Sequence, residues 1–216
     1  MVINLQPEES IIMFKEKLNK KLANALALNG IETPKELQLK CIAKINGGFD
    51  IIGIGPLNSG KTTTIIISAI QKLQYAIETA PRVLIVVSDK QKAMAMQEQV
   101  MLLAEGTDLR SVCVYEEGKI EKQAEEVQKG IDILIGTPKR IMEHYFLWNL
   151  NLNKIKLFAI DDTETMPKIS AQGEIDRLAL SLPKCQHLVF TTELNEKVEK
   201  LIKKFIIAPQ IFEVLE

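Results

Sequence analysis

Short runs of consecutive apolar residues recur along this chain and alternate with longer stretches of helical length. Uninterrupted apolar runs of this kind are typical of strands that are covered on both faces, as in a parallel sheet. The runs predict strands at 50–54, 82–87, 111–115, 131–135, 156–160, 187–190 and 210–214.

The stretches between the runs predict helices. Residues 10–28 carry Ile11, Phe14, Leu18 and Leu22 at helical spacing, and lysines occupy most of the remaining face. Further helices are predicted at 63–73, 89–104, 119–129, 171–182 and 195–205. Another helix is predicted to follow residues 136–140 and to end at about 146.

A helix is also predicted just before the first strand. Gly30 is expected to end the helix over 10–28, and Thr33 is expected to begin the next one. Thr33 and Glu36 have the spacing of a capping box, with Pro34 at the first helical position. This helix carries Gln38 in its second turn.

The alternation of strands and helices predicts an α/β fold with a mostly parallel sheet and helices on both faces. Such sheets bind ligands at the carboxyl ends of their strands. No linker, repeat or low-complexity segment interrupts the pattern. We therefore expect a single domain over residues 1–216, in which about 1–48 form N-terminal helices.

Composition agrees with a soluble globular protein, because 46% of the 216 residues are hydrophobic and 25% are charged. The net charge of −1 does not indicate nucleic-acid binding, although a local basic patch would suffice for it. The three cysteines lack metal-ligand spacing, and no signal peptide or membrane span is evident. A cytoplasmic protein with reduced thiols and no membrane partner is expected.

The stretch from Gly55 to Thr62 fits the phosphate-binding pattern G-x-x-x-x-G-K-[ST]. It stands between a predicted strand and a predicted helix, where backbone N–H groups and the helix N-terminus converge on one point. Lys61 would reach the β- and γ-phosphates, and the Thr62 hydroxyl would ligate Mg²⁺. The candidate phosphate-binding residues are Gly55, Asn58, Ser59, Gly60, Lys61, Thr62 and Thr63.

Two adjacent acids, Asp161 and Asp162, follow the predicted strand at 156–160. Nucleotide hydrolysis needs carboxylate help for Mg²⁺ and a group that positions the attacking water. Asp161 is the candidate Mg²⁺ ligand beside Thr62, and Asp162 is the candidate for orienting water. The alternative is that the pair forms a plain turn.

These segments, in this order, resemble the first RecA-like domain of DEAD-box RNA helicases. Residues 30–38 resemble the adenine-reading Q motif, with Phe14 as the upstream aromatic residue, and the phosphate loop matches directly. The remaining matches are 87–91 for Pro-Thr-Arg-Glu, Gly118 for one glycine of a Gly-Gly pair, Thr137-Pro138-Lys139-Arg140 for Thr-Pro-Gly-Arg, 161–164 for Asp-Glu-Ala-Asp and 191–193 for Ser-Ala-Thr.

The resemblance implies an ATP- and Mg²⁺-binding domain that also binds RNA through its backbone, without reading sequence. It implies that Phe14 and Gln38 contact adenine and that Lys61, Asp161 and Asp162 are catalytic. The implied RNA contacts are Lys90, Gly118, Thr137, Pro138 and Arg140. The implied coupling residues are Glu164, Thr191 and Glu193.

The departures from the family pattern concern turnover. Asp162 stands where a glutamate is expected, and Glu193 replaces a hydroxyl that should meet Glu164, so two like charges would repel there. Asn58 replaces a loop glycine, but asparagine tolerates left-handed backbone. The second RecA-like domain, which supplies arginines to the γ-phosphate, is absent from this sequence. We expect weak or no unwinding by this domain alone.

Three interpretations follow. The first is an ATP- and RNA-binding domain related to DEAD-box helicases, which acts with a second RecA-like domain or as a reduced relative. The second is a binding or regulatory module that keeps the fold and has lost turnover. The third is a small-molecule phosphotransferase, which the scarcity of arginine and the fifty or so residues before the loop disfavour.

Overall fold

The computed structural model describes residues 14–77, 79–148, 150–163 and 168–215. Its middle layer is a seven-stranded sheet in the order β3-β4-β2-β5-β6-β1-β7, and all neighbouring strands run parallel. This confirms the predicted parallel sheet. The strands are β1 (Ile51–Ile54), β2 (Val83–Val86), β3 (Ser111–Val114), β4 (Ile133–Gly136), β5 (Leu157–Ile160), β6 (Gln186–Thr191) and β7 (Gln210–Glu213).

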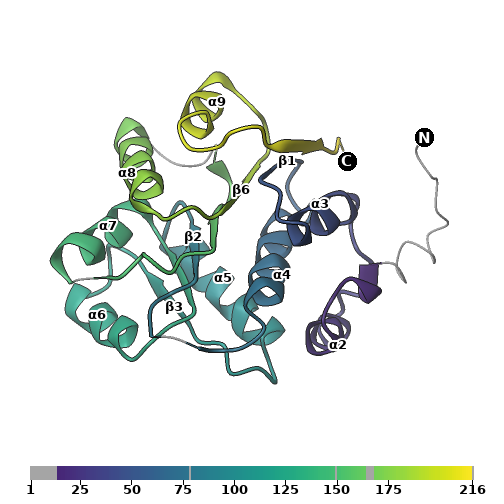
Figure 1. Cartoon of the computed structure of the whole chain (residues 1–216), viewed down its shortest axis with the longest axis horizontal. Coiled ribbons are helices and arrows are strands. Elements are labelled where there is room, and N and C mark those ends of the chain that lie inside the picture. The colour runs from purple at the N-terminus through teal and green to yellow at the C-terminus, as the bar shows by residue number, and fades with distance from the viewer. Residues whose placement is uncertain (1–13, 78, 149, 164–167, 216) are drawn as a thin grey trace.

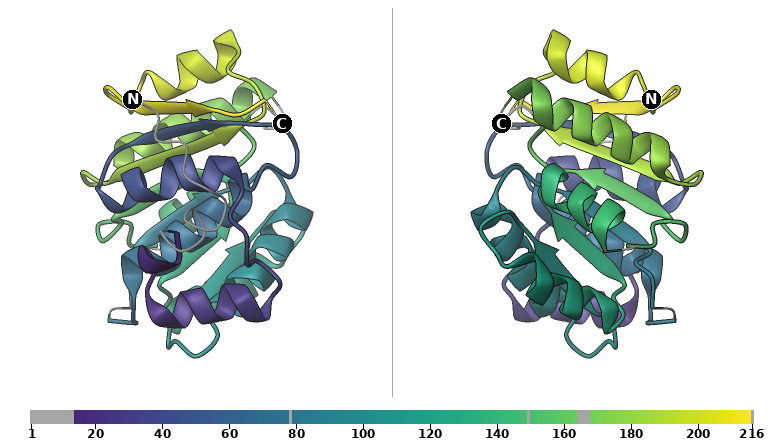
Figure 2. Two further views of the ribbon diagram at one scale, coloured as in Figure 1. Left: turned by 90° about the vertical axis from the view of Figure 1, so that its right-hand side faces the viewer. Right: turned by 90° about the vertical axis from the view of Figure 1, so that its left-hand side faces the viewer.

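Helices cover both faces of the sheet, as predicted (Figures 1 and 2). The first four described helices pack on one face, and the last four pack on the other. None of the described helices is long and apolar enough to cross a bilayer. The helices are α2 (Lys20–Leu28), α3 (Glu36–Asn46), α4 (Lys61–Leu73), α5 (Lys90–Leu103), α6 (Ile120–Gln128), α7 (Pro138–Leu147), α8 (Lys168–Ser181) and α9 (Glu196–Ile202).

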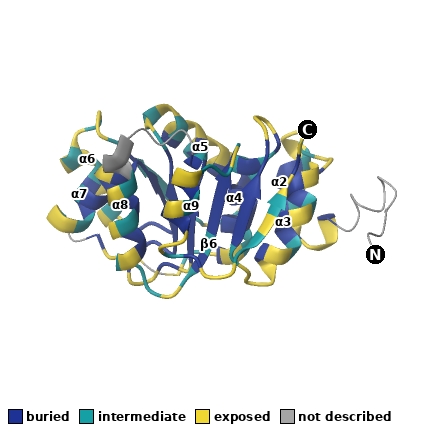
Figure 3. Ribbon diagram, turned by 90° about the horizontal axis from the view of Figure 1, so that it is seen from above, coloured by how far each residue is buried: buried dark blue, intermediate teal, exposed yellow. Residues whose placement is uncertain are grey.

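Alternate residues of the central strands enter two separate cores. In β2, Val83 and Ile85 pack toward α2–α5, whereas Leu84 and Val86 pack toward α6–α9. Because successive strand side chains point to opposite faces, both faces must be apolar for this arrangement. The apolar runs of the inner strands β1, β2, β4 and β5 therefore become a fully buried part of the middle layer in Figure 3, whereas the edge strands β3 and β7 are partly exposed.

The single helix predicted over 10–28 is wrong in its described part. Residues 14–16 are helical, but α2 begins only at Lys20, with Asn19 as its N-cap. The Asn19 side chain accepts a hydrogen bond from the Leu22 N–H, and its own N–H donates to Gln71. Because Asn19 caps a new helix, the helix does not run continuously through the apolar residues that are spaced for one.

The predicted start of the next helix is also wrong. Lys35, not Thr33, precedes the first helical residue of α3. The backbone N–H of Lys35 donates to the side-chain oxygen of Gln38 at 2.8 Å. Gln38 thus accepts the N-cap N–H, as the third helical residue does in a capping box. Gln38 therefore fixes the start of α3.

A buried ion-pair group joins the amino ends of three neighbouring strands. Asp132, which has no exposed surface, accepts hydrogen bonds from Arg82 at 2.8 Å and from the Arg110 Nε at 2.9 Å. Burial alone would raise the pKa of Asp132, but hydrogen bonds from Arg110 and Arg82 outweigh burial and hold the pKa below its usual value. The ionised carboxylate is thereby part of the native core.

Candidate nucleotide-binding site

The phosphate loop lies at the carboxyl end of β1, between β1 and α4. Two of its residues adopt left-handed backbone, Asn58 at φ 65° and Gly60 at φ 93°. A Cβ atom on Gly60 would lie 3.0 Å from the side-chain amide of Gln38, so the left-handed conformation favours glycine there and a larger residue would also displace Gln38. Asn58 confirms the expected tolerance of asparagine for this conformation.

Lys61 is folded back into the loop that it follows. Its ammonium group donates to the carbonyl oxygens of Gly55 at 2.8 Å and Pro56 at 2.9 Å, and its side chain is only 5% exposed. The same nitrogen is 3.6 Å from a carboxylate oxygen of Asp162. The loop is therefore wrapped around a positive charge.

The start of α4 is joined to the end of β5 by a side-chain contact. The Thr62 hydroxyl donates to Asp161 at 2.7 Å. Asp161 is buried, and burial and the neighbouring Asp162 raise its pKa to about 6, although Thr62, Lys92 and Lys61 act against this. Its second oxygen, Oδ1, has no hydrogen-bond partner in the described part of the chain.

These groups fit a magnesium ion. Mg²⁺ takes oxygen ligands, and it is usually held by one or two carboxylates together with substrate phosphates. A hydroxyl and a buried carboxylate with one unused oxygen supply such ligands beside the phosphate loop. Among the described residues, no group of three or more acidic, histidine or cysteine side chains could hold a metal by itself.

Asp162 adopts left-handed backbone, at φ 49°, which is uncommon for a residue other than glycine. Its Oδ2 forms an ion pair of 2.9 Å with Lys92 of α5. Sequence reasoning missed Lys92. Lys90, which was predicted to contact RNA, lies over the ring of Tyr115 at 5.3 Å. Lys92 is in the first turn of α5, where the N-cap Asp89 accepts its backbone N–H.

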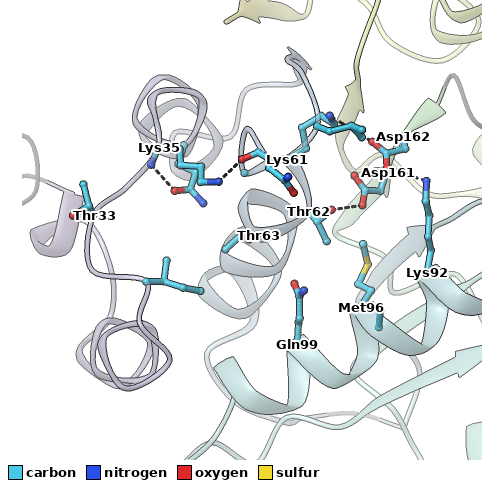
Figure 4. Close-up of a pocket in the computed structure, with 16 residues that line it drawn as sticks. Thr33, Lys35, Lys61, Thr62, Thr63, Lys92, Met96, Gln99, Asp161 and Asp162 are labelled. Carbon is cyan, nitrogen blue, oxygen red and sulfur yellow. Dashed lines mark hydrogen bonds and ion pairs between the residues drawn. The ribbon is translucent and has the colours of Figure 1, made fainter. Parts of the chain in front are cut away.

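The loop, the two acids and α5 enclose a cavity of about 440 Å³ (Figure 4). The structure brings six of the predicted nucleotide contacts together, because the cavity is lined by Gln38, Asn58, Gly60, Lys61, Thr62 and Thr63. Phe14 does not line this cavity and packs in the core at 4% exposure. Other lining residues are Ile31, Thr33, Lys35, Leu57, Lys92, Ala95, Met96, Gln99, Asp161 and Asp162.

The residues predicted to contact RNA gather near the ends of β3 and β4. Arg140 donates to the carbonyl oxygens of Gly118 and Glu116, and Thr137 donates to the Glu116 carboxylate. Arg140 is only 6% exposed, so its guanidinium holds the turn at Glu116–Gly118 in place. Pro138 is the first residue of α7, and its missing N–H suits that position.

The predicted coupling residues are only partly visible. Glu164 lies outside the described residues. Thr191, at the end of β6, donates to the Glu193 carbonyl oxygen, and the Glu193 carboxylate accepts from Asn195. Thr163 donates to the Phe190 carbonyl at 3.1 Å. Thr163 therefore joins the acidic segment to β6, a contact that sequence reasoning missed.

Comparison with known proteins identifies the family. The profile of the DEAD/DEAH box helicases matches residues 35–201. The ATP-dependent RNA helicase DeaD of Haemophilus influenzae is 25% identical, over 84% of this chain and 30% of that protein. The ATP-dependent RNA helicase dbp10 of Emericella nidulans is 29% identical, over 84% of this chain and 20% of that protein.

A solved structure shows the same fold. A DEAD box protein from Methanococcus jannaschii superposes with a TM-score of 0.85 at 22% identity, over 91% of this chain and 54% of that one. This confirms the predicted RecA-like α/β fold. The chain spans less than a third of the length of these two curated relatives. With its parallel sheet, its phosphate loop and a profile match over most of its length, the chain belongs to the DEAD/DEAH box helicase family.

Proposed function

We propose that this chain is the nucleotide-binding domain of an ATP-dependent RNA helicase, and that it binds ATP with Mg²⁺ in the 440 Å³ cavity. The observation that carries the proposal is the contact between Thr62 and Asp161, which places a hydroxyl and a buried carboxylate beside Lys61. Bound Mg²⁺ would neutralise charge that develops on the phosphates. Thr62 and Asp161 are the residues that would hold it.

The remaining roles belong to the chain's own side chains. Lys61 exchanges its contacts with Gly55 and Pro56 for phosphate oxygens. Asp162 orients the attacking water. Gln38 contacts adenine with its amide, because an amide oxygen with two lone pairs can keep the Lys35 N–H and accept a second donor. The other proposed loop contacts are Gly55, Asn58, Ser59, Gly60 and Thr63.

RNA is proposed to lie across the same edge of the sheet and to be held by its backbone. Such binding is weak, sensitive to salt and indifferent to sequence. The proposed contacts are Lys90, Gly118, Thr137, Pro138 and Arg140, and the proposed coupling residues are Glu164, Thr191 and Glu193. We also propose that residues 1–216 form one domain, in a cytoplasmic protein, that does not unwind duplexes without a second RecA-like domain.

Calorimetry with MgATP tests the nucleotide proposal. Wild-type protein is expected to bind ATP more tightly than GTP, and Lys61→Ala is expected to lose binding. Lys90→Ala serves as the matched control, because Lys90 lies outside the cavity on the neighbouring helix. Equal heats from wild type and Lys61→Ala, or tighter binding of GTP, would contradict the proposal.

A binding module without turnover is the second candidate. It is favoured by the ion pair between Asp162 and Lys92, because a carboxylate held by a lysine is less free to position water. Measurement of ATP hydrolysis with single-stranded RNA present separates the two candidates: turnover supports the helicase domain, and nucleotide binding without turnover supports the module.

A further inference from the structure

Lys92 brings a second ammonium group to the phosphate end of the nucleotide cavity. It lies in the first turn of α5, it lines the cavity together with Lys61, and its side chain reaches toward Asp162 (Figure 4). Its Nζ is 2.9 Å from Asp162 Oδ2, while the Lys61 Nζ is 3.6 Å from Asp162 Oδ1. Two lysines from different elements therefore flank one carboxylate.

The position of Lys92 differs from that of Lys61 in one respect. Lys61 belongs to the loop and contacts the carbonyls of Gly55 and Pro56, whereas Lys92 approaches from α5, across the end of β5. A diphosphate bound in the loop would present its β-phosphate to Lys61. The third phosphate of a triphosphate would add negative charge beyond the β-phosphate, so we expect a second cation beside Asp162 to interact mainly with that phosphate.

We propose that Lys92 contacts the terminal phosphate and makes the site prefer nucleoside triphosphate over diphosphate. The inference rests on the proposed function, since it requires that adenine nucleotides enter this cavity. The proposal gives Lys92 a phosphate contact that none of the sequence motifs predicts. The cation comes from the same domain as the phosphate loop, so discrimination of ATP from ADP is available before any partner closes on the site.

Asp162 competes with the phosphate for Lys92. An ammonium group has three N–H donors, so an ion pair with a carboxylate does not by itself prevent a contact to phosphate. The negative charge of Asp162 nonetheless opposes that of the phosphate at the same place. Neutralising Asp162 is therefore expected to strengthen triphosphate binding, and Lys92 is expected to mediate part of this gain.

The helix that carries Lys92 does not depend on its side chain. Asp89 caps α5 by accepting the backbone N–H of residue 92, and the Lys92 side chain is 33% exposed. Replacing the ammonium group therefore leaves the cap and the core of α5 intact. Lys122, an exposed lysine of α6 that does not line the cavity, provides the control.

The first test compares ligands. Titration calorimetry with Mg²⁺ and either ADP or the non-hydrolysable imido analogue of ATP gives the ratio of the two affinities. A charge-assisted hydrogen bond corresponds to a loss of roughly tenfold to a hundredfold. Lys92→Met is expected to lose this factor for the triphosphate and less than about twofold for ADP. Lys92→Arg, which keeps the charge, and the control Lys122→Met should keep the wild-type ratio.

The second test is a double-mutant cycle. Asp162→Asn should tighten binding of the triphosphate analogue in the wild-type background and clearly less so in Lys92→Met. Equal losses for both ligands in Lys92→Met, or an Asp162→Asn gain that is the same in both backgrounds, would show that Lys92 acts only as a structural partner of Asp162. A wild type that binds neither nucleotide would overturn the proposed function itself.

Discussion

The hydroxyl of Thr62 and the carboxylate of Asp161 are 2.7 Å apart, although the two residues are 99 positions apart in the sequence. The contact crosses from the start of α4 to the end of β5. It holds a carboxylate whose pKa burial and Asp162 raise to about 6, beside the phosphate loop. Asp161 thus serves the ligand at some expense to the stability of the ligand-free chain.

The first prediction concerns this expense. When the pKa of an acid is higher in the folded chain than in the unfolded chain, protonation of that acid favours the folded state. The contribution of Asp161 to stability should therefore be greatest below its usual pKa of 3.8 and should decline as the pH rises to about 6. Asp161→Asn is expected to raise the free energy of unfolding at pH 7, without Mg²⁺, by an amount on the order of 1–3 kcal/mol.

Urea denaturation between pH 4 and 7.5 measures this effect, as the difference between wild type and Asp161→Asn. Taking the difference removes the opposite contributions of acids with lowered pKa, such as Asp132. The same variant should lose the Mg²⁺ dependence of nucleotide binding. A variant that is less stable than wild type at pH 7 would contradict the prediction.

The second prediction concerns the buried pair of Arg82 and Asp132. Asp132→Asn leaves the nearly inaccessible guanidinium of Arg82 without a counter-charge, and removing one partner of a buried pair typically costs about 3–5 kcal/mol. Stability supplied by Asp132 should be present above its ordinary pKa and lost on acidification, because its folded pKa is lowered. Thermal and urea unfolding give the measurement.

An exposed ion pair provides the control for this prediction. Glu126→Gln breaks the pair between Glu126 and Lys129, whose side chains are both more than half exposed. Surface pairs of this kind contribute little, so unfolding should be unchanged. Similar losses in Asp132→Asn and Glu126→Gln would mean that the buried pair makes no special contribution.

The third prediction concerns the length of Asp162. Asp162→Glu should raise RNA-stimulated ATP hydrolysis, because an oxygen that is about 1 Å too far from its water can cost ~10²-fold in rate. Aspartate tolerates the left-handed backbone at φ 49° better than glutamate does. The substitution should therefore also lower thermal stability, by about 1 kcal/mol. Steady-state hydrolysis and thermal melts on one preparation check both parts.

Nucleotide affinity gives the discriminating control for Asp162→Glu, because a group that only positions water should leave affinity nearly unchanged. A large change in affinity with no change in rate would assign Asp162 a structural role.

The fourth prediction concerns Glu116, whose carboxylate accepts the Thr137 hydroxyl in the region proposed for RNA. Glu116→Ala should free that hydroxyl and remove a negative charge from a surface that must meet phosphates. Affinity for single-stranded RNA is expected to rise by roughly threefold to tenfold, the size of one modest hydrogen bond or charge contact. Fluorescence anisotropy at several salt concentrations measures it.

Glu117→Ala is the matched control for Glu116→Ala. It removes the same charge from the next residue, whose side chain makes no hydrogen bond to Thr137 in the described structure. If both variants raise RNA affinity alike, the gain comes from net charge and not from the Thr137 hydroxyl.

The layout of the fold was predictable because it depends on local signals. Apolar runs fixed the strands, and the phosphate loop with its flanking strand and helix depended on residues that are adjacent in sequence, from Gly55 to Thr62. Asp161 was found because it follows an apolar strand directly. Helix starts were less predictable, since Asn19 and Gln38 cap helices with side chains whose roles depend on their surroundings.

The contacts that could not be predicted from the sequence join separate helices and strands. Whether Lys90 or Lys92 points into the cavity depends on the rotational phase of α5 and on its packing against the sheet. The contact from Thr163 to Phe190 requires that β5 and β6 be neighbours, and the order of strands in a sheet is not written in any one of them.

The folded-back position of Lys61 bears on how fast a nucleotide can enter. Its contacts with the carbonyls of Gly55 and Pro56 hold the loop together, so phosphate entry requires one side chain to change partners and no backbone segment to become ordered. Side-chain and loop rearrangements of this size take nanoseconds to microseconds. Stopped-flow mixing with a fluorescent ATP analogue should therefore give a single phase whose rate rises linearly with nucleotide concentration, without a plateau.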